Sequence, residues 1–253
     1  MSGTGAQSKS KTDSPMEYQM NHKRRGLALI FNQEKLQDLT ERHDTNKDRD
    51  NLTERLQDLG FEVKLHNDKN KEEMLKEMHK VAAANHTDAD CFVCIFLTCG
   101  EEGQINTSND SIKIKEITDL FRGDQCKSLV GKPKIFIFQA FAGNKLEAAV
   151  TGMMAGDTDE EVEEAANIYT IPAGADFLMC YSVAEESGSF YIQDLCETLQ
   201  QHGSTMEFTE LLTLVNLKVS RHNIKLRGGE MQKIQMPYFT SMLTKKLYFR
   251  SKK

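Results

Sequence analysis

The stretch that decides the fold is Lys132-Pro-Lys-Ile-Phe-Ile-Phe-Gln-Ala-Phe-Ala-Gly143. Its centre, residues 135–138, is a short continuous run of β-branched and aromatic residues with glycine and proline on its flanks. Such a run is typical of a strand that is buried on both faces of a mostly parallel sheet. Ligand and catalytic sites of these sheets lie just past the carboxyl ends of the strands. A functional site is therefore expected at residues 139–143.

The composition excludes several classes of protein. The chain has 253 residues, of which 39% are hydrophobic and 28% charged, and this suits one large α/β domain with a buried core. The net charge of −6 argues against a general binder of nucleic acid or anionic membranes. No apolar run approaches the roughly 18 residues of a membrane span, and the polar N-terminal stretch is not a signal peptide. The cysteines follow no disulfide or metal spacing, so reduced thiols, a cytoplasmic location, no metal and no cofactor are expected.

The order of the periodic segments predicts the architecture. Apolar runs predict buried strands, and apolar residues that recur every three or four positions predict amphipathic helices. Strands and helices alternate, which implies an α/β fold with a mostly parallel central β-sheet flanked by helices on both faces. The expected strands are 26–31, 61–66, 91–97, 135–138 and 175–182, the expected helices are 52–59, 70–85, 189–199 and 207–219, and a last extended segment is 234–243.

Several polar segments separate these elements. Residues 42–51 are predicted to form a polar loop, and the acidic stretch 144–167 is either a mobile connector or a short helix. Two short basic clusters, residues 22–25 and 250–253, are interpreted as solvated flanks.

Six stretches, taken in their order and spacing, point to one known family: 24–32, 90–101, 129–134, 139–143, 172–178 and 241–247. With them the chain resembles an executioner-type caspase of peptidase family C14 over residues 18–253. Residues 24–32 resemble the first strand of that family, residues 90–101 its histidine-bearing strand, and residues 139–143 its nucleophile motif. The resemblance implies one caspase-like domain with a short disordered leader (1–20), a large-subunit region (21–143), an intersubunit linker (144–167) and a small-subunit region (168–253).

The catalytic positions of the family hold residues that cannot perform its chemistry. That chemistry needs a thiolate nucleophile and an imidazole base. The family's Ser-His-Gly-Glu reads Thr98-Cys99-Gly100-Glu101 here, and its Gln-Ala-Cys-(Arg/Gln/Gly)-Gly has Phe141 in place of the cysteine. The N–H groups of Gly100 and Phe141 are expected to remain as the remnant of an oxyanion hole. Phe141 either packs into the core or lies across the old cleft.

The substrate pocket is reduced as well. Caspases hold an aspartate with two arginines and a glutamine, and Arg42 and Gln139 resemble the first arginine and the glutamine by position. The loop that bears the second arginine is cut to residues 183–187, and the chain has no tryptophan. With base, nucleophile and loop all missing, the chain is interpreted as a natural pseudoenzyme resembling the caspase-like decoys, and an insect source is expected. A residual aspartate-directed cysteine endopeptidase that uses Cys99 is a weaker alternative, because His66 and His86 are distant from Cys99 in sequence.

Two functional classes remain. The first is a regulator that pairs with an active paralogous caspase as a heterodimer, or with itself, through an edge strand. The second is a decoy that titrates caspase inhibitors or adaptors. The sequence leaves open whether a partner is activated or inhibited, with enhancement favoured. The candidate edge residues are Gln235, Met236, Tyr238, Thr240 and Met242, and the possible cleavage sites, in a chain expected to work uncut, are Asp13, Asp157 and Asp159.

Overall fold

A computed structural model of the chain describes residues 16–35, 44–100, 103–141, 174–183, 189–222, 224–225, 231–232 and 236–252. The helices in this part of the chain are α1 (Asp44–Asp58), α2 (Lys71–Ala82), α3 (Ile114–Asp119), α4 (Phe190–His202) and α5 (Phe208–Val219), with a 3-10 turn at Lys127–Leu129. The strands of the main sheet are β1 (Arg24–Asn32), β2 (Glu62–Asn67), β3 (Ala89–Cys99), β6 (Lys134–Phe141), β7 (Phe177–Val183) and β10 (Tyr238–Ser241). Two small hairpins are formed by β4 (Gln104–Asn106) with β5 (Ser111–Lys113) and by β8 (Ile224–Lys225) with β9 (Met231–Gln232).

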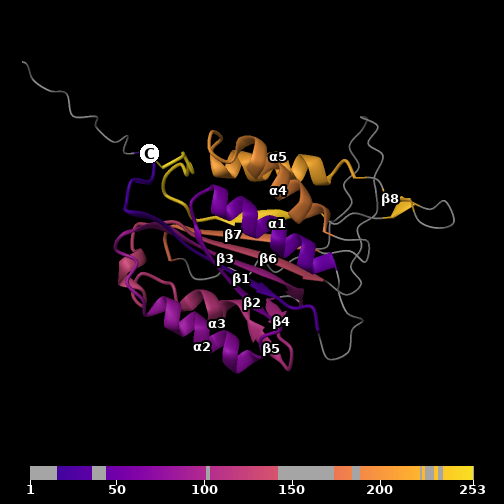
Figure 1. Ribbon diagram of the computed structural model, residues 1–253, viewed down its shortest axis with the longest axis horizontal. Coiled ribbons are helices and arrows are strands. Elements are labelled where there is room, and N and C mark those ends of the chain that lie inside the picture. Colours follow the sequence, from indigo (N-terminus) through magenta and orange to yellow (C-terminus); the bar gives the residue numbers. More distant parts are fainter. Residues whose placement is uncertain are drawn as a thin grey trace, which may run out of the picture.

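The main sheet has the strand order β10-β7-β6-β3-β1-β2. Every neighbouring pair is parallel except β10 and β7, which are antiparallel. Helices α1, α4 and α5 cover one face of the sheet, and α2 and α3 cover the other (Figure 1). The chain thus has the α/β fold that its alternating segments predict, and β10 and β2 are the edges of the described sheet. Every helix in the described residues is too short or too polar to span a bilayer.

The sheet is buried on both faces because its central strands carry apolar side chains in both directions. All 11 residues of β3 are buried. Ile30, Ile95 and Ile137 lie in the core beneath α1, α4 and α5. The phenylalanines one position further along each of these strands lie in the core beneath α2 and α3. This two-residue alternation fixes the face to which each residue at the carboxyl ends of the strands belongs.

One row of rings crosses the whole sheet. At one rung of the register, each of the six strands carries an aromatic or imidazole ring. Neighbouring ring centroids lie 4.8, 5.3, 5.1, 5.5 and 5.0 Å apart in strand order, and every pair is stacked. From β2 to β10 these residues, here called the aromatic row, are His66, Phe31, Phe96, Phe138, Tyr181 and Tyr238. The row connects the two edges of the sheet through ring contacts.

The helix prediction is wrong at the start of α1. The helix begins at Asp44, whereas the sequence predicts a polar loop over residues 42–51 and a helix only from Leu52. The first two turns place Thr45 and Asp48 on the buried side of the helix. The apolar period that signals an amphipathic helix therefore appears only from Leu52 onward.

The other predicted elements are present with shifted ends. Asn70 caps α2 through a capping box, and Ser189 caps α4 by accepting a hydrogen bond from Ile192 at 3.1 Å. The extended segment predicted over 234–243 contains the shorter strand β10. The hairpin of β4 and β5 and helix α3 were not predicted, because elements this short show no clear period.

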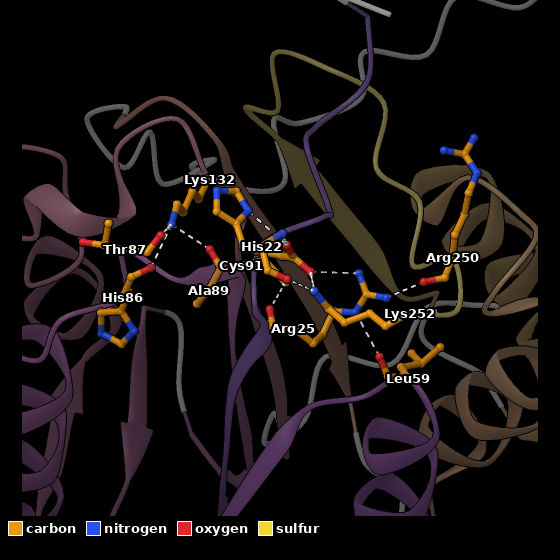
Figure 2. Close-up of polar contacts among 11 residues, drawn as sticks. His22, Arg25, Leu59, His86, Thr87, Ala89, Cys91, Lys132, Arg250 and Lys252 are labelled. Atoms are coloured by element: carbon orange, nitrogen blue, oxygen red, sulfur yellow. Dashed lines mark hydrogen bonds and ion pairs between the residues drawn. The ribbon is translucent and has the colours of Figure 1, made fainter. Parts of the chain in front are cut away.

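A buried carboxylate gathers side chains from both ends of the chain at the amino edge of the sheet. Asp90 accepts hydrogen bonds from Arg25 at 3.2 Å and from the ring of His22 at 3.0 Å. It also forms an ion pair with Lys252 at 2.7 Å. Figure 2 shows His22, Arg25 and Lys252 side by side, with Lys132 and the carbonyl groups that it binds next to them.

Arg25 corrects the expectation that both basic clusters are solvated. Its guanidinium donates to the carbonyl oxygens of Leu59 at 2.9 Å and of Arg250, and its side chain is fully buried (Figure 2). An arginine can be buried in this way because an ionised partner and carbonyl acceptors replace its hydration. The network therefore ties the C-terminal cluster to β1.

A second hydrogen-bond network joins three segments that are far apart in the sequence, through Tyr18, Asp176 and Thr244. The Tyr18 hydroxyl donates to Asp176 at 2.6 Å, Thr244 Oγ1 donates to the same carboxylate oxygen at 2.7 Å, and the Thr244 N–H donates to the Tyr18 hydroxyl at 2.9 Å. Burial, followed by the hydrogen bond to Asp176, raises the pKa of Tyr18 to about 12. Residues 16–20, which the sequence assigns to a disordered leader, are thus part of the described structure, and Tyr18 is buried in its core.

Candidate functional site

The two positions that carry the altered motifs are neighbours in the sheet. Cys99 ends β3 and Phe141 ends β6, and they are Cα partners at the last rung of this parallel pair. Cys99 is 4% exposed and is not in a disulfide. The sequence predicts a site at the carboxyl ends of these strands, and the register brings its two parts together. For Phe141 the structure describes the backbone alone, so whether its side chain packs in the core or lies across a cleft stays a prediction.

The turn after β3 is held closely against β4. A Cβ atom at Gly100 would lie 2.3 Å from the carbonyl oxygen of Gln104, so only glycine fits there. Thr98 Oγ1 donates to the carbonyl of Asn106 at 2.6 Å and so also joins the end of β3 to β4. The N–H groups of Gly100 and Phe141 therefore belong to the ends of two neighbouring strands. Their convergence on one oxyanion stays a prediction.

Neither of the two histidines considered from the sequence lies beside Cys99. His86 precedes β3, at the opposite end of that strand, and its ring contacts the carbonyl of Val81 at 2.7 Å. His66 lies on β2 and stacks on Phe31, which places it on the face of the sheet opposite to Cys99. Burial lowers the pKa of both imidazoles. The described part of the chain therefore offers Cys99 neither of these rings as a base.

The expected pocket residue Gln139 lies two residues before Phe141 and is almost fully buried. Its register partners are Leu97 on β3 and Ser182 on β7. Oxygen atoms of Gln139 and Ser182 have no hydrogen-bond partner among the described residues. Arg42, the other expected pocket residue, and the shortened loop that follows β7 lie outside the described residues.

A second candidate surface is the outer edge of β10. This strand ends the described sheet and pairs with β7 only. Met236 and Tyr238 are 43% and 57% exposed, and the ring of Tyr238 stacks on Tyr181 at 5.0 Å. Thr240 and Met242 are half-buried, and Gln235 lies outside the described residues. The edge strand that the sequence predicts is confirmed, although it is shorter than expected.

Comparison with known proteins identifies the family. Residues 25–248 match the family model described as the caspase domain. The chain belongs to the caspase family. It is 51% identical to caspase-6 of Mus musculus over 256 aligned positions, which cover 94% of this chain and 93% of that protein. It is 38% identical to caspase-7 of Gallus gallus (92% and 80% covered) and 37% identical to caspase-3 of Oryctolagus cuniculus (92% and 86% covered).

The comparisons bear on two of the expectations. Membership of the caspase family agrees with the six-stranded α/β sheet and with the resemblance seen in the sequence. These relatives are vertebrate proteins and lend no support to an insect source. The assignment of Cys99 to the base position and Phe141 to the nucleophile position of caspases stays a prediction from the motifs.

Sequence reasoning missed some residues at this caspase site. Ser182 and Asn32 lie on the same rung as Gln139, but a serine or an asparagine at the end of an apolar run carries no signal of its own. Their position on this rung depends on the register between strands, which one sequence does not reveal. The possible cleavage sites Asp13, Asp157 and Asp159 lie outside the described residues.

Proposed function

We propose that this chain is a non-catalytic caspase homologue that regulates apoptotic caspase activity in the cytoplasm. It pairs with an active paralogous caspase and raises the activity of that partner. The observation that carries the proposal is the edge strand β10, whose outer side is turned away from the rest of the sheet. An exposed strand edge is a template for a further strand, because its backbone groups can bond to a neighbouring chain.

The hydrogen bonds of β10 indicate which backbone groups face outward. Met242 donates to the carbonyl of Phe177 at 2.8 Å and accepts from the N–H of Asp176 at 2.8 Å, so its backbone groups face β7. Those of Thr240 and Tyr238 face the same way, since the direction alternates along an antiparallel strand. The N–H and C=O groups of Phe239 and Ser241 therefore point toward the position that a partner strand would take.

The side chains on this edge also suit a protein interface. Met236 and Tyr238 belong to the small group of large hydrophobic side chains that are exposed in the described residues. Aromatic residues and methionine are enriched at protein interfaces. Tyr238 is held flat on Tyr181, so its ring is already ordered before a partner arrives and loses little side-chain entropy on binding.

The residues at the caspase motif positions support a non-catalytic role. Phenylalanine has no proton to lose and no lone pair with which to attack a carbonyl, so Phe141 cannot form an acyl-enzyme. The thiol of Cys99 cannot replace an imidazole that accepts and returns a proton near neutral pH. A chain that keeps the fold and the pairing edge without this chemistry is suited to act on a partner.

The proposal is tested by titrating a purified active executioner caspase with this protein and measuring peptide cleavage after aspartate. We expect the wild-type chain to raise the rate. Tyr238→Asp and Thr240→Arg should abolish the effect, because each would bury an unpaired charge on association at a cost on the order of 3 kcal/mol or more. Leu217→Asp is the matched control, since Leu217 is an exposed apolar residue on α5, away from β10.

Each outcome of this titration separates the alternatives. If the wild-type chain lowers the rate and the β10 variants do not, pairing through β10 is supported but its effect on the partner is inhibition. Equal effects of the wild-type and β10 variants, or no effect at any concentration, would refute pairing through β10. Recovery of a caspase inhibitor or adaptor instead of a caspase in a pull-down would then favour the decoy function.

We further propose that the chain works uncut. A variant with Asp13, Asp157 and Asp159 all replaced by glutamate should resist cleavage at these three positions and should affect the partner as the wild-type chain does. Mass mapping after incubation with an active caspase establishes whether the wild-type chain was cut. A requirement for cleavage before any effect on the partner would contradict this part of the proposal.

A further inference from the structure

The first described residues of the chain run beside the segment that follows β10. Lys246 donates its N–H to the carbonyl of Met16 at 2.7 Å, and Tyr18 donates its N–H to the carbonyl of Lys246 at 3.0 Å. Glu17 and Lys246 thus form a parallel bridge, and the indigo and yellow segments lie side by side there (Figure 1). We call residues 16–18 the N-terminal strap.

The side chain of Tyr18 links this strap to the end of β10. Its hydroxyl donates to Asp176 Oδ1 at 2.6 Å and accepts the N–H of Thr244 at 2.9 Å. Thr244 Oγ1 donates to the same Asp176 oxygen at 2.7 Å. The backbone of Asp176 extends the connection, because its N–H donates at 2.8 Å to the carbonyl of Met242, one residue past the end of β10. A path of hydrogen bonds therefore runs from the N-terminal strap to β10.

Asp176, in the middle of this path, has a backbone conformation that its contacts must support. Its φ angle is 69°, in the left-handed region that residues other than glycine rarely adopt. Such a conformation persists where the surrounding structure fixes it. For Asp176 the fixing contacts are two hydroxyl donors on its buried side chain and backbone bonds to Lys134 and Met242. Loss of the Tyr18 hydroxyl removes one of these contacts and leaves a buried carboxylate with one donor fewer, which destabilises this arrangement.

Strand β10 is the element most affected by a change at Asp176. It has four residues and pairs with β7 on one side only. Its first and last residues are exposed, and the two between them are half-buried. Short elements with few buried contacts open more easily than the core of a fold. The outward N–H and C=O groups of Ser241 directly precede Met242, so the bonds that fasten Met242 also set the direction in which these groups point.

We propose that the N-terminal strap is a conformational device that holds β10 ready for pairing. With Tyr18 docked on Asp176 and Thr244, the end of β10 is ordered before a partner strand arrives, so association costs less conformational entropy. With Tyr18 released, the same edge is less ordered and binds a partner more weakly. This inference rests on the proposed pairing through β10 and adds that residues 16–18, outside the edge itself, regulate it.

Amide hydrogen exchange of the full chain tests the link between the strap and β10. Tyr18→Phe keeps an aromatic ring in the core and removes only the hydroxyl. We expect the N–H groups of Asp176 and Met242 to exchange at least fivefold faster in this variant, because both bonds fasten the end of β10 to β7. If Tyr18 only adds to overall stability, the slowest amides, in the fully buried strand β3, accelerate and those of Asp176 and Met242 do not.

Titration of an active executioner caspase measures the consequence for pairing. Half of the maximal effect on its rate should require at least fivefold more Tyr18→Phe than wild-type chain, a usual size for coupling between two sites. The maximal effect should be unchanged, because the residues of β10 are the same. Tyr248→Phe is the matched control: it removes a tyrosine hydroxyl four residues after Thr244 and should behave as the wild-type chain does.

The outcomes separate this inference from the proposed function. Equal half-maximal concentrations for Tyr18→Phe and wild type, or unchanged exchange at Asp176 and Met242, would overturn control by the strap and leave pairing through β10 intact. An equal loss in Tyr248→Phe would overturn it as well. If the wild-type chain has no effect on the caspase at any concentration, the proposed function is refuted, and the inference fails with it because no association is left to control.

Discussion

Cys99 and Phe141 are Cα partners at the last rung that β3 shares with β6. The two residues that depart most from the caspase motifs are therefore adjacent in space as well as equivalent in their place on neighbouring strands. The ends of β3 and β6 are thus in register. That this chain differs from an active caspase in the side chains at these two positions and in the length of the segment after β7 is the prediction from the motifs.

Phe141→Cys alone should not give a protease. The substitution returns a thiol to β6, but its neighbour at the base position is still Cys99, which cannot act as an imidazole does near neutral pH. We expect no cleavage of aspartyl peptides above background, and no labelling of the wild-type chain by aspartyl electrophiles. An active caspase assayed in parallel is the positive control. Measurable turnover by the single variant would mean that the pocket is assigned wrongly.

The outward groups of β10 predict the register in which two copies of this chain would pair. With Thr240 opposite itself, Phe239 faces Ser241 of the second copy and each exchanges both backbone hydrogen bonds. With Phe239 opposite itself, Ser241 would face Pro237, which has no N–H to donate. A self-paired edge is therefore expected to be centred on Thr240.

Disulfide cross-linking of variants with one added cysteine tests this register directly. In a pair centred on Thr240, the two copies of Thr240→Cys lie about 4.5 Å apart at Cα, within disulfide range, whereas two copies of Phe239→Cys are diagonal neighbours about 7–8 Å apart. We expect mild oxidation to cross-link Thr240→Cys and to leave Phe239→Cys and Ser241→Cys monomeric on a non-reducing gel. The native cysteines are all buried and give little background. Preferential cross-linking of Phe239→Cys would contradict the register.

Removing the charge of Asp90 should cost far more stability than removing the charge of Asp88. Asp90 is buried with Arg25, so Asp90→Asn leaves a guanidinium without its counter-ion, at about 3–5 kcal/mol of the free energy of unfolding. Asp88 pairs with Arg24 at the surface, where such a pair contributes less than about 1 kcal/mol. Urea denaturation of both variants measures the difference. Equal losses would show that the network at the amino edge is not a buried ion pair in solution.

Tyr18 should make stability fall at alkaline pH. Burial, followed by the hydrogen bond to Asp176, raises its pKa from about 10 in the unfolded chain to about 12 in the fold, so the fold disfavours the ionised phenolate relative to the neutral phenol by roughly 2.7 kcal/mol. The stability of the folded chain is therefore highest with respect to this group below pH 10 and is lost as the pH rises through 12, because the unfolded chain ionises first. We expect wild type to be more stable than Tyr18→Phe by a constant amount below pH 10 and by a shrinking amount above it. A difference that stays constant to pH 12 would contradict the assignment.

The pattern of apolar residues made the sheet predictable, but it gave no signal for the buried polar residues at the carboxyl ends of the strands. The strands β1, β3 and β6 each contain a continuous apolar run, so their burial could be predicted from the sequence. The first turns of α1 could not, since the residues that face the sheet there are Thr45 and Asp48. The helix signal thus failed where polar residues, and not apolar ones, occupy the buried side of the helix.

Charge and register account for the other failures. From the sequence Arg25 looks like part of a solvated cluster, because its ion-pair partner Asp90 lies 65 positions later in the chain. The motif drew attention to Gln139, but the place of Ser182 beside it, and of Asn32 on the far side of Leu97, follows from strand alignment alone. The position of β10 at an edge of the sheet was predictable because Pro237, just before this strand, disfavours a central strand. Its use as a dimer edge stays a prediction.

The aromatic row helps to fix how the carboxyl ends of β3 and β6 are aligned. Cys99 and Phe141 each come three residues after a member of the row, Phe96 and Phe138. The stacked rings of Phe96 and Phe138 keep β3 and β6 in register. Any two residues that stand three positions after these rings therefore lie side by side, whatever their side chains. The alignment of positions 99 and 141 therefore depends on ring contacts three residues earlier, so substitutions at these two positions are expected to leave their alignment unchanged.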